Sequence, residues 1–448
     1  MTIRFLNVTW SGRFVVVQRN LYHQTHLTDS MSTLLENNLA SYSLKPEKIV
    51  IPNDSSDMVR VFKEAHRESR KIAIFGNGTQ SDLGGPLSVG DITVSTRGLN
   101  AIIEHDVQNL TATVQSGIEF NALQRALKSK GQFIPLDPYV PTNATIGGVV
   151  ATNASGPRRF HFGTCRDLIL GMTFILPDAT SAKIGGKTMK NVAGFEIGKL
   201  FIGSMGTLGV IDRLTFRLYP VPDVEKTVLI ICEDDESFRR LQKTILASKL
   251  VFTTIDLFDS NALKRMGHDS DENAIGITVR FEGNEDVVDY GIRMVSDIVE
   301  KNGSAEVNEV EGTFWEDISA FHLDDQTETR LKASVPVADA MDVVNLIRKM
   351  QKDLGIQVPV TGHAGNGILY AHIPAVQPED AKHALRRLRT DVEQMNGRLT
   401  ILKTTEAVRS EIDMWGVREP LKLELSSNIK KRFDPENILV NGRYIGGI

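Results

Sequence analysis

Three polar aromatic side chains surround Asn366 and Gly367 in the segment VPVTGHAGNGILYAHIP. An Asn-Gly pair between alternating residues predicts a two-residue β-hairpin turn, which would place His363 opposite Tyr370 across the two strands. Because strand side chains alternate between the faces of a sheet, Tyr370 and His372 share a face and His363 joins them. Imidazole titrates near neutral pH and suits the removal of a hydroxyl proton, so His363 and His372 are candidate general bases. Ordinary half-buried strand residues are the alternative.

Two basic residues form a second candidate group. Arg330 and Lys332 alternate in ETRLKASVPV, so both side chains lie on one face of a predicted strand. They could meet a negatively charged ligand, or they could form salt bridges to a neighbouring helix.

A glycine-rich turn is the first candidate cofactor loop. In IFGNGTQSDLGG a predicted strand leads into Gly76, Asn77, Gly78 and Thr79, where small residues allow backbone N–H groups to surround a pyrophosphate. The Rossmann fingerprint needs a helix after the glycines and an acidic residue about 20 positions on, and Arg97 lies there instead. This argues against NAD, and no Walker-type GxxxxGKS or GxxxxGKT sequence supports ATP. A plain turn is the alternative.

Two further glycine-rich segments occur at residues 135–163, PLDPYVPTNATIGGVVATNASGPRRFHFG, and at residues 202–211, IGSMGTLGVI. Their small and polar residues could lay backbone against a flat, extended cofactor and offer it many hydrogen-bond donors. Each segment alone could be structural, but three of them in one predicted fold are hard to explain by turns.

The elements that must position these groups indicate an α+β fold. An amphipathic helix at residues 57–70 runs into the strand KIAIFG, and strands follow at residues 91–96, 110–117, 167–178 and 207–220. The pattern changes near Pro222, where helices at residues 284–302, 337–354 and 379–396 begin to alternate with strands. We expect these helices to cover one face of an antiparallel sheet.

Length and composition exclude several classes of protein. The chain has 448 residues, a net charge of −5 with both signs interspersed, and two cysteines. This argues against a nucleic-acid partner, a disulfide framework and an iron–sulfur cluster, which takes four thiolates. No apolar stretch reaches the roughly 20 residues of a membrane span, and no secretion signal is evident, so we expect a cytoplasmic protein, with membrane association only through partner subunits. Residues 1–30 carry little periodic signal and could be a disordered extension or a mis-chosen start.

The order of five motifs resembles the FAD-binding domain of the vanillyl-alcohol oxidase / p-cresol methylhydroxylase superfamily. These motifs are FGNGT, PLDP…ATIGGVVATNASG, FGTCRDLILGMTFILPD, KTMKNVAGFEIGKL and GSMGTLGVI. The segments GPRRFHFGTCRDLILG and GGKTMKNVAGFEIGKL are similar to the FAD-binding subunit of glycolate oxidase, and GHAGNG with FDPENILVNGRYIGG resembles the FAD-linked oxidase C-terminal domain.

The resemblance implies a two-part FAD-binding domain of the p-cresol methylhydroxylase type and a C-terminal FAD-linked-oxidase domain with an antiparallel sheet. The expected divisions are an N-terminal extension at 1–42, the FAD-binding domain at 43–222, a substrate or cap domain at 223–430, and a segment at 431–448 that returns to the flavin. The residues carried over as FAD contacts are Gly76, Asn77, Gly78, Thr79, Gln80, Pro138, Thr145, Gly148, Asn153, Ser155, Gly156, Gly163, Gly206, Gly209, Val210 and Asn441. Since the first loop lacks a histidine, the FAD should be non-covalent.

The resemblance also implies a catalytic site. Relatives that oxidise 2-hydroxy acids carry a metal-binding histidine where Tyr370 stands and a glutamate in an EHG sequence, and this chain has neither. We therefore expect no metal, and expect Arg330 and Lys332 to meet the substrate carboxylate, with His363, His372 and Tyr370 beside it. Arg443 and Asn441 fall on the C-terminal loop that relatives fold toward the flavin.

Two functions are consistent with these motifs and with the resemblance. One is an FAD-dependent dehydrogenase or oxidase of a small 2-hydroxy acid such as glycolate or D-lactate, with hydride transfer to the flavin. The other is a non-catalytic or relay FAD subunit of a glycolate-oxidase-like complex. In both, electrons leave through a separate acceptor or an iron–sulfur or flavin partner subunit.

Overall fold

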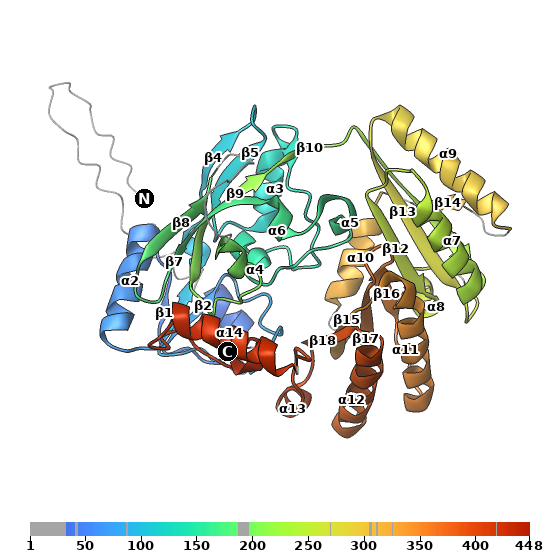
Figure 1. Ribbon diagram of the computed structural model, residues 1–448. Coiled ribbons are helices and arrows are strands. Elements are labelled where there is room, and N and C mark those ends of the chain that lie inside the picture. Colours follow the sequence, from blue (N-terminus) through green and yellow to red (C-terminus); the bar gives the residue numbers. More distant parts are fainter. Residues whose placement is uncertain are drawn as a thin grey trace, which may run out of the picture.

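The computed structural model describes residues 33–40, 44–86, 88–186, 197–268, 270–303, 307–310, 312–324, 326–417 and 419–448. Most of the expected N-terminal extension lies outside these residues, as does all of KTMKNVAGFE at 187–196. Two lobes lie side by side, the first built mainly from the N-terminal half and the second from the C-terminal half (Figure 1).

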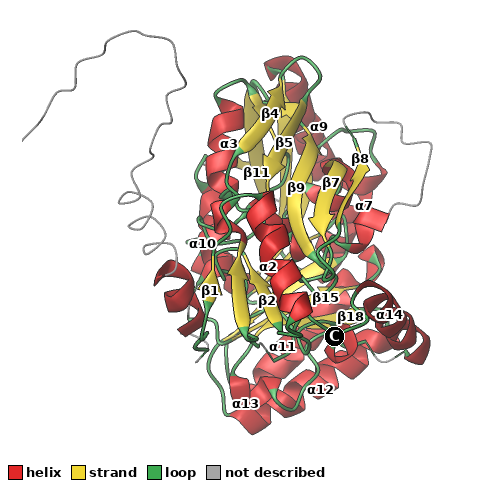
Figure 2. Ribbon diagram, turned by 90° about the vertical axis from the view of Figure 1, so that its left-hand side faces the viewer, coloured by secondary structure: helices red, strands yellow, loops and turns green. Residues whose placement is uncertain are grey.

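The first lobe contains two main sheets, as expected for a two-part domain. A parallel sheet has the order β1 (Ile49–Val50), β3 (Ile92–Ser95), β2 (Ile72–Phe75). An antiparallel sheet has the order β4 (Ile102–Asp106), β5 (Thr111–Gln115), β9 (Val210–Arg217), β7 (Ile169–Ile175), β8 (Ser181–Gly185). A short ladder joins β6 (Gln132–Phe133) to β10 (Tyr219–Pro220). Figure 2 shows the two main sheets one above the other.

Helices connect and cover these sheets. They are α2 (Ser55–Arg67), α3 (Phe120–Lys128), α4 (Ile146–Ala151), α5 (Arg159–Phe162) and α6 (Cys165–Leu168). The predicted amphipathic helix is α2, which buries Met58, Phe62 and Ala65, and the Asp54 side chain caps its first turn by accepting from the N–H of Asp57.

The second lobe is built on one antiparallel sheet. Its strand order is β14 (Val307–Glu309), β11 (Val224–Cys232), β13 (Ile275–Gly283), β12 (Thr254–Asp259), β16 (Val360–His363), β17 (Ile368–Ile373), β15 (Thr329–Ser334), β18 (Arg398–Lys403). The antiparallel sheet predicted from the sequence is confirmed.

Four long helices pack on one face of this sheet. They are α7 (Asp235–Ala247), α9 (Glu285–Lys301), α11 (Ala340–Leu354) and α12 (Pro378–Gln394), and they share one hydrophobic core with alternate strand residues. The predicted helices at residues 284–302, 337–354 and 379–396 correspond to α9, α11 and α12, and they cover one face as expected. On the other face, α8 (Ser260–Arg265) and α10 (Phe314–Leu323) form a smaller core with strand residues of opposite parity, such as Leu229 and Phe258.

The C-terminal segment returns to the first lobe (Figure 1). After α13 (Glu406–Arg409) and α14 (Pro420–Phe433), Val440 N donates to Ile72 O, so the chain lies beside β2. Nζ of Lys430 is 2.6 Å from Asp434 Oδ2 and 3.0 Å from Thr207 O, which ties α14 to the loop before β9. In the described part of the chain, no helix is long and apolar enough to cross a membrane.

Candidate functional site

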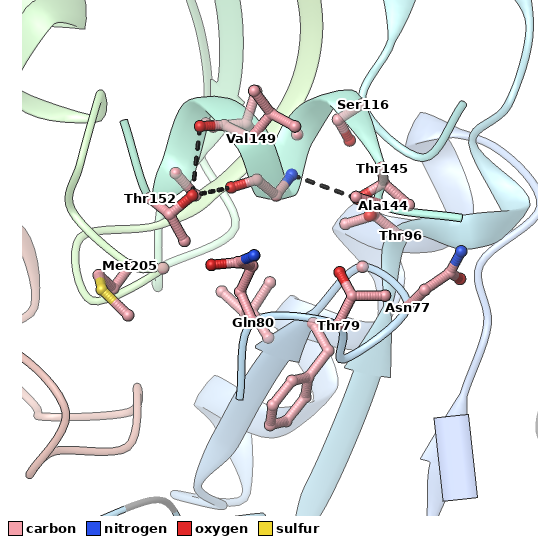
Figure 3. Close-up of a pocket in the computed structure, with 18 of the residues that line it drawn as sticks. Asn77, Thr79, Gln80, Thr96, Ser116, Ala144, Thr145, Val149, Thr152 and Met205 are labelled. Atoms are coloured by element: carbon pink, nitrogen blue, oxygen red, sulfur yellow. Dashed lines mark hydrogen bonds between the residues drawn. The ribbon is translucent and has the colours of Figure 1, made fainter. Parts of the chain in front are cut away.

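The glycine-rich loops surround a cavity of about 750 Å³, here called the glycine pocket (Figure 3). The loop after β2 forms one side, the first turns of α4 form the opposite side, and Met205 lies at one end. Lining residues that the sequence singled out are Gly76, Asn77, Gly78, Thr79, Gln80, Thr145, Gly148, Gly206, Gly209 and Val210.

Close backbone packing builds this pocket. A Cβ atom at Gly76 would lie 2.1 Å from Thr145 Oγ1, and one at Gly147 would lie 2.7 Å from the Ser116 Cβ, so neither position accepts a side chain. Thr145 Oγ1 accepts from Gly148 N at 3.2 Å and caps α4. A Cβ at Gly148 would meet only Thr145 Oγ1, at 3.2 Å, so a side chain there would extend into the pocket.

The pocket contains an unsatisfied polar group. Ser116 is fully buried and lines the pocket, and its hydroxyl has no hydrogen-bond partner within the described residues. Buried hydroxyls are normally hydrogen-bonded, so this one fits a polar group on a bound ligand. The glycine cradle and this hydroxyl are compatible with FAD.

The C-terminal segment completes one wall. Arg443 lines the glycine pocket, and its guanidinium donates to Gln80 O at 2.6 Å and to Leu83 O at 3.2 Å. A Cβ atom at Gly84 would lie 2.2 Å from Arg443 O, so the loop and the C-terminal segment are in direct backbone contact. Asn441, the other candidate on this segment, is exposed and lines neither of the two pockets described here.

A second cavity of about 730 Å³ adjoins the first and is here called the sheet pocket. Thr79, Gln80 and Thr152 line both cavities, so the two lie side by side. The other lining residues are Asp82, Leu83, Tyr139, Asn153, Ala154, Ser155, His322, Arg330, Lys332, Tyr370 and Leu402. The sheet pocket therefore lies between the first lobe and the second. Besides Thr79 and Gln80, it contains five of the residues singled out from the sequence: Asn153, Ser155, Arg330, Lys332 and Tyr370.

Besides Asn441, three candidate cofactor residues lie in neither pocket. Pro138 is buried in the segment that reaches the second lobe. A Cβ at Gly156 would lie 1.9 Å from Asp137 O, so Gly156 allows two backbone segments to touch. Gly163 has φ +80°, which glycine adopts readily, and it ends α5.

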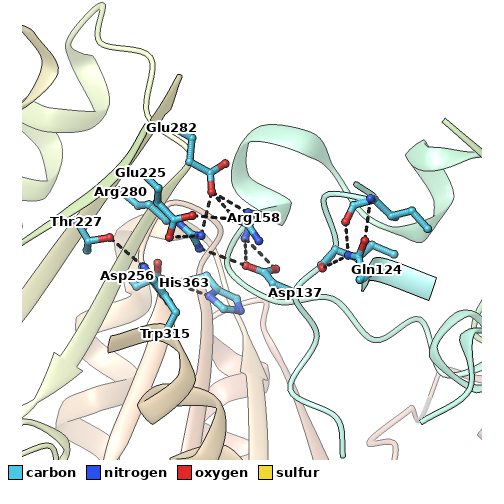
Figure 4. Close-up of polar contacts among 12 residues, drawn as sticks. Gln124, Asp137, Arg158, Glu225, Thr227, Asp256, Arg280, Glu282, Trp315 and His363 are labelled. Carbon is cyan, nitrogen blue, oxygen red and sulfur yellow. Dashed lines mark hydrogen bonds and ion pairs between the residues drawn. The ribbon is translucent and has the colours of Figure 1, made fainter. Parts of the chain in front are cut away.

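An ion network joins the two lobes beside the sheet pocket (Figure 4). The Arg158 guanidinium contacts Glu282 Oε1 at 2.5 Å, and its backbone N–H donates to the Asp137 carboxylate at 3.1 Å. Arg280 contacts Glu282 Oε1 at 2.9 Å and Glu225 Oε1 at 2.5 Å. These contacts fix the segment after β6 against β13. Tyr139 lies in that segment and is thereby brought into contact with the second lobe.

Side-chain parity explains why the candidates gather on one sheet face. On β15 and β17, Leu331, Ala333, Leu369 and Ala371 face the helical layer, so Arg330, Lys332, Tyr370 and His372 face the opposite way. Arg330 pairs with His372 and Lys332 with Tyr370 across the two strands.

The predicted hairpin register is wrong by two residues. His363 pairs with Ile368, and Thr361 pairs with Tyr370, because the turn contains four residues, 364–367. A shift of two preserves parity, so His363 still shares a face with Tyr370. It lies two positions farther from Tyr370 than the two-residue turn implied.

The two candidate histidines of the hairpin are held by side chains outside the sheet pocket. His363 Nδ1 lies 2.7 Å from Asp256 Oδ1, and both side chains are buried (Figure 4). His372 Nδ1 lies 3.3 Å from Thr327 Oγ1, and burial, with Arg330 and Arg265 nearby, lowers the pKa of His372 to about 3. Neither residue lines either of the two pockets.

Positive charge faces the sheet pocket from β15. Burial, with a contribution from Arg159, lowers the pKa of Lys332 from its ordinary 10.5 to about 8. Arg330 Nη1 donates to the backbone oxygen of His322, which fixes its position at the end of α10. Burial raises the pKa of Tyr370 above its usual range, so its hydroxyl is protonated and can donate a hydrogen bond.

Two lining residues carried no sequence signal. His322 lies on α10, about 40 positions before the hairpin, and Tyr139 lies in PLDPYVP, next to the candidate cofactor residue Pro138. Their rings stack with centroids 3.8 Å apart and planes at 8°. No sequence motif marks either residue, so only the packing of the structure identifies them as lining residues.

No cluster of three or more His, Cys, Asp or Glu side chains suited to a metal ion occurs among the residues that the structure describes.

Comparison with known proteins gives two family matches. Residues 46–185 match the FAD binding domain, and residues 221–403 match the C-terminal domain of FAD linked oxidases. The chain is similar to the glycolate oxidase subunit GlcD of Bacillus subtilis, with 26% identity over 90% of this chain and 89% of that protein. It is equally similar to a D-lactate dehydrogenase of Archaeoglobus fulgidus, with 26% identity over 89% of this chain and 91% of that protein.

Among solved structures, an alkyldihydroxyacetonephosphate synthase shares the fold. Its TM-score is 0.68, with 20% sequence identity over 87% of this chain and 76% of that one.

Proposed function

The chain belongs to the FAD linked oxidases, and on that basis we propose that it oxidises a small 2-hydroxy acid, of the glycolate or D-lactate type, to the 2-oxo acid. The observation that carries this proposal is that Thr79, Gln80 and Thr152 line both pockets. A cofactor cradle therefore lies beside a cationic pocket, so a carboxylate and a flavin can be adjacent.

FAD binding is assigned to the glycine pocket. Gly76–Gln80 and the start of α4 would hold the phosphates and ribityl chain, and the Ser116 hydroxyl offers a hydrogen bond. When bound, FAD supplies a two-electron acceptor for hydride.

Substrate binding is assigned to the sheet pocket. Arg330 and Lys332 face it from adjacent positions of one strand face and supply the charge that a carboxylate requires. The protonated Tyr370 hydroxyl can donate to the same substrate. Tyr139 and Leu402 supply apolar surface that limits the size of the acid and excludes water.

Tyr370 also keeps a second candidate function open. Because a tyrosine stands where metal-dependent relatives carry a ligand, the chain could be an FAD-binding relay subunit whose substrate is oxidised by a partner. The relative named as a glycolate oxidase subunit supports an assembly of this kind.

Anaerobic reduction of the purified protein tests the two functions. Glycolate, D-lactate, L-lactate and larger 2-hydroxy acids are mixed with the oxidised protein, with and without EDTA, and the flavin absorbance is followed. Bleaching by at least one 2-hydroxy acid at the same rate in EDTA is the expected result. No bleaching by any of them, in a protein that dithionite reduces, would leave the relay function. Loss of bleaching in EDTA and recovery with zinc or manganese would contradict the metal-free site.

A further inference from the structure

His322 is the histidine that borders the sheet pocket. We propose that it is the catalytic base, which accepts the hydroxyl proton of the substrate during oxidation. This inference rests on the proposed function and assigns a residue to its proton-transfer step. It differs from the expectation drawn from the hairpin, where His363 and His372 were the candidates.

Burial and orientation single out His322. The residue is 2% exposed, yet it lines the sheet pocket together with Arg330, Lys332 and Tyr370. Its Nε2 lies 3.0 Å from Thr361 Oγ1, and in the described part of the chain Nδ1 has no hydrogen-bond partner. If Nε2–H donates to the threonine hydroxyl, the Nδ1 lone pair is available as a proton acceptor.

Three aromatic neighbours hold the ring in this orientation. It stacks on Tyr139 at 3.8 Å, and its edge contacts are Tyr370 at 5.0 Å and His372 at 4.9 Å between centroids. Thr361 on β16 fixes the remaining rotation. A ring clamped from two lobes and hydrogen-bonded at one nitrogen is preorganised for transfer at the other.

The same residue is linked to the carboxylate anchor. Arg330 Nη1 donates to the backbone oxygen of His322, so the cation and the imidazole are positioned by one contact. A 2-hydroxy acid carries its hydroxyl on the carbon next to the carboxylate. A carboxylate held by Arg330 and Lys332 therefore leaves the hydroxyl within the part of the pocket that His322 borders.

The ionisation of His322 suits a proton acceptor. Burial lowers the pKa of His322 well below its usual range, and His372, Arg330 and His363 add to this effect. The ring is therefore neutral near pH 7, with its acceptor nitrogen unprotonated. A bound substrate carboxylate brings an opposite charge, which favours the imidazolium formed in the reaction.

In the proton-transfer step, His322 accepts the proton of the substrate hydroxyl. The substrate O–H bond breaks and an N–H bond forms at His322 Nδ1. The O–H electron pair forms the new C=O bond as the α-C–H bond breaks, and FAD, when bound in the glycine pocket, would supply the two-electron acceptor for the hydride that leaves the α-carbon. The products are the 2-oxo acid and a protonated imidazole, which returns its proton to solvent.

The hairpin histidines are less suitable for this step. His363 Nδ1 is occupied by Asp256, and neither His363 nor His372 lines the two pockets. His372 lies behind the His322 ring and beside Arg330 on the neighbouring strand, and its Nδ1 faces Thr327.

Substitution of His322 tests the proposal. His322→Gln and His322→Asn are compared with wild type and with His383→Gln, an exposed histidine of α12. The readouts are FAD content, the rate of anaerobic flavin reduction by the acid that wild type oxidises, and the spectral shift on binding the matching 2-oxo acid. We expect reduction to slow by about 10²- to 10⁴-fold, with FAD content and 2-oxo acid affinity retained. His383→Gln should behave as wild type.

A rescue experiment separates chemistry from structure. Free imidazole should accelerate flavin reduction in His322→Ala and leave wild type unchanged. Thr361→Val, which keeps the imidazole but removes its tautomer-fixing partner, should slow reduction less than His322→Gln does. Reduction of either His322 variant within about threefold of wild type overturns the proposal, because a base contributes at least 10²-fold. If no 2-hydroxy acid reduces wild type, the proposed function itself fails, and that result is distinct from a wild-type rate in the variants.

Discussion

Asp256 Oδ1 lies 2.7 Å from His363 Nδ1, and both side chains are at most 4% exposed on the sheet face that carries the candidate site. β12 supplies the aspartate and β16 the histidine, and these strands are neighbours in the sheet. The pair therefore joins two strands at the base of the site.

We expect Asp256→Ala to lower the free energy of unfolding by about 2 kcal/mol, because it leaves a buried imidazole nitrogen without its partner. Asp342→Ala is the matched control, since Asp342 pairs with Arg239 at a half-exposed position and should cost less than about 1 kcal/mol. Urea unfolding of the FAD-loaded protein measures both. Equal losses would contradict a stabilising role for the buried pair.

Gly148→Val should weaken FAD binding by at least about tenfold, because its branched side chain would occupy the glycine pocket. Gly312→Val is the control, since a Cβ there meets nothing within 4 Å. The flavin-to-protein absorbance ratio after purification gives the FAD content. Stoichiometric FAD in Gly148→Val would show that the cofactor lies elsewhere.

Acid precipitation of the purified yellow protein should release its FAD into the supernatant. The loop from Gly76 to Gln80 contains no histidine or cysteine that could form a covalent bond to the flavin. Flavin that remains with the precipitated polypeptide would identify a covalent link at another residue.

The Michaelis constant for the acid substrate should rise above pH 8. The pKa of Lys332 is about 8 in the folded protein and 10.5 ordinarily, so its positive charge is present below pH 8 and is lost as the pH rises through that value. Lys332→Arg should move the rise to higher pH, because the guanidinium stays protonated. A pH profile of kcat/KM for both proteins measures this, and superimposable profiles would exclude Lys332 as the carboxylate anchor.

The lowered pKa of Lys332 also affects folding stability, in the direction opposite to its effect on substrate binding. Between pH 8 and 10.5 the unfolded chain holds the Lys332 proton while the folded chain has released it, so this group makes the folded state more stable as the pH rises through that window.

The reduced flavin should react slowly with oxygen and rapidly with an artificial dye. The two cysteines, Cys165 and Cys232, are both buried and far apart in sequence, and they cannot ligate a cluster to carry electrons onward. Stopped-flow reoxidation of the dithionite-reduced protein compares the two acceptors. Rapid reaction with oxygen and stoichiometric peroxide would indicate a self-sufficient oxidase.

Much of the fold could be predicted because its signals are local. Helical periodicity predicted α2, α9, α11 and α12 within a few residues, and the alternation of strand residues predicted which side chains share a face. The prediction of the shared face held although the predicted hairpin register was wrong. The four-residue turn moved the register by two residues, which kept Tyr370 and His363 on the same side. The glycine loops could also be predicted from the sequence, because the close approach of Thr145 to Gly76 leaves room for glycine only.

By itself, the sequence determined the residue types of the cofactor loops, the antiparallel sheet and the cationic strand face. Tertiary structure alone decided which histidine borders the substrate pocket. His322 comes from a helix on the second face of the sheet, and Tyr139 comes from the other lobe, carried there by the contact of Arg158 with Glu282. Spacing along a chain records local periodicity, whereas contact between such distant segments depends on how two lobes pack, and no short motif encodes that packing.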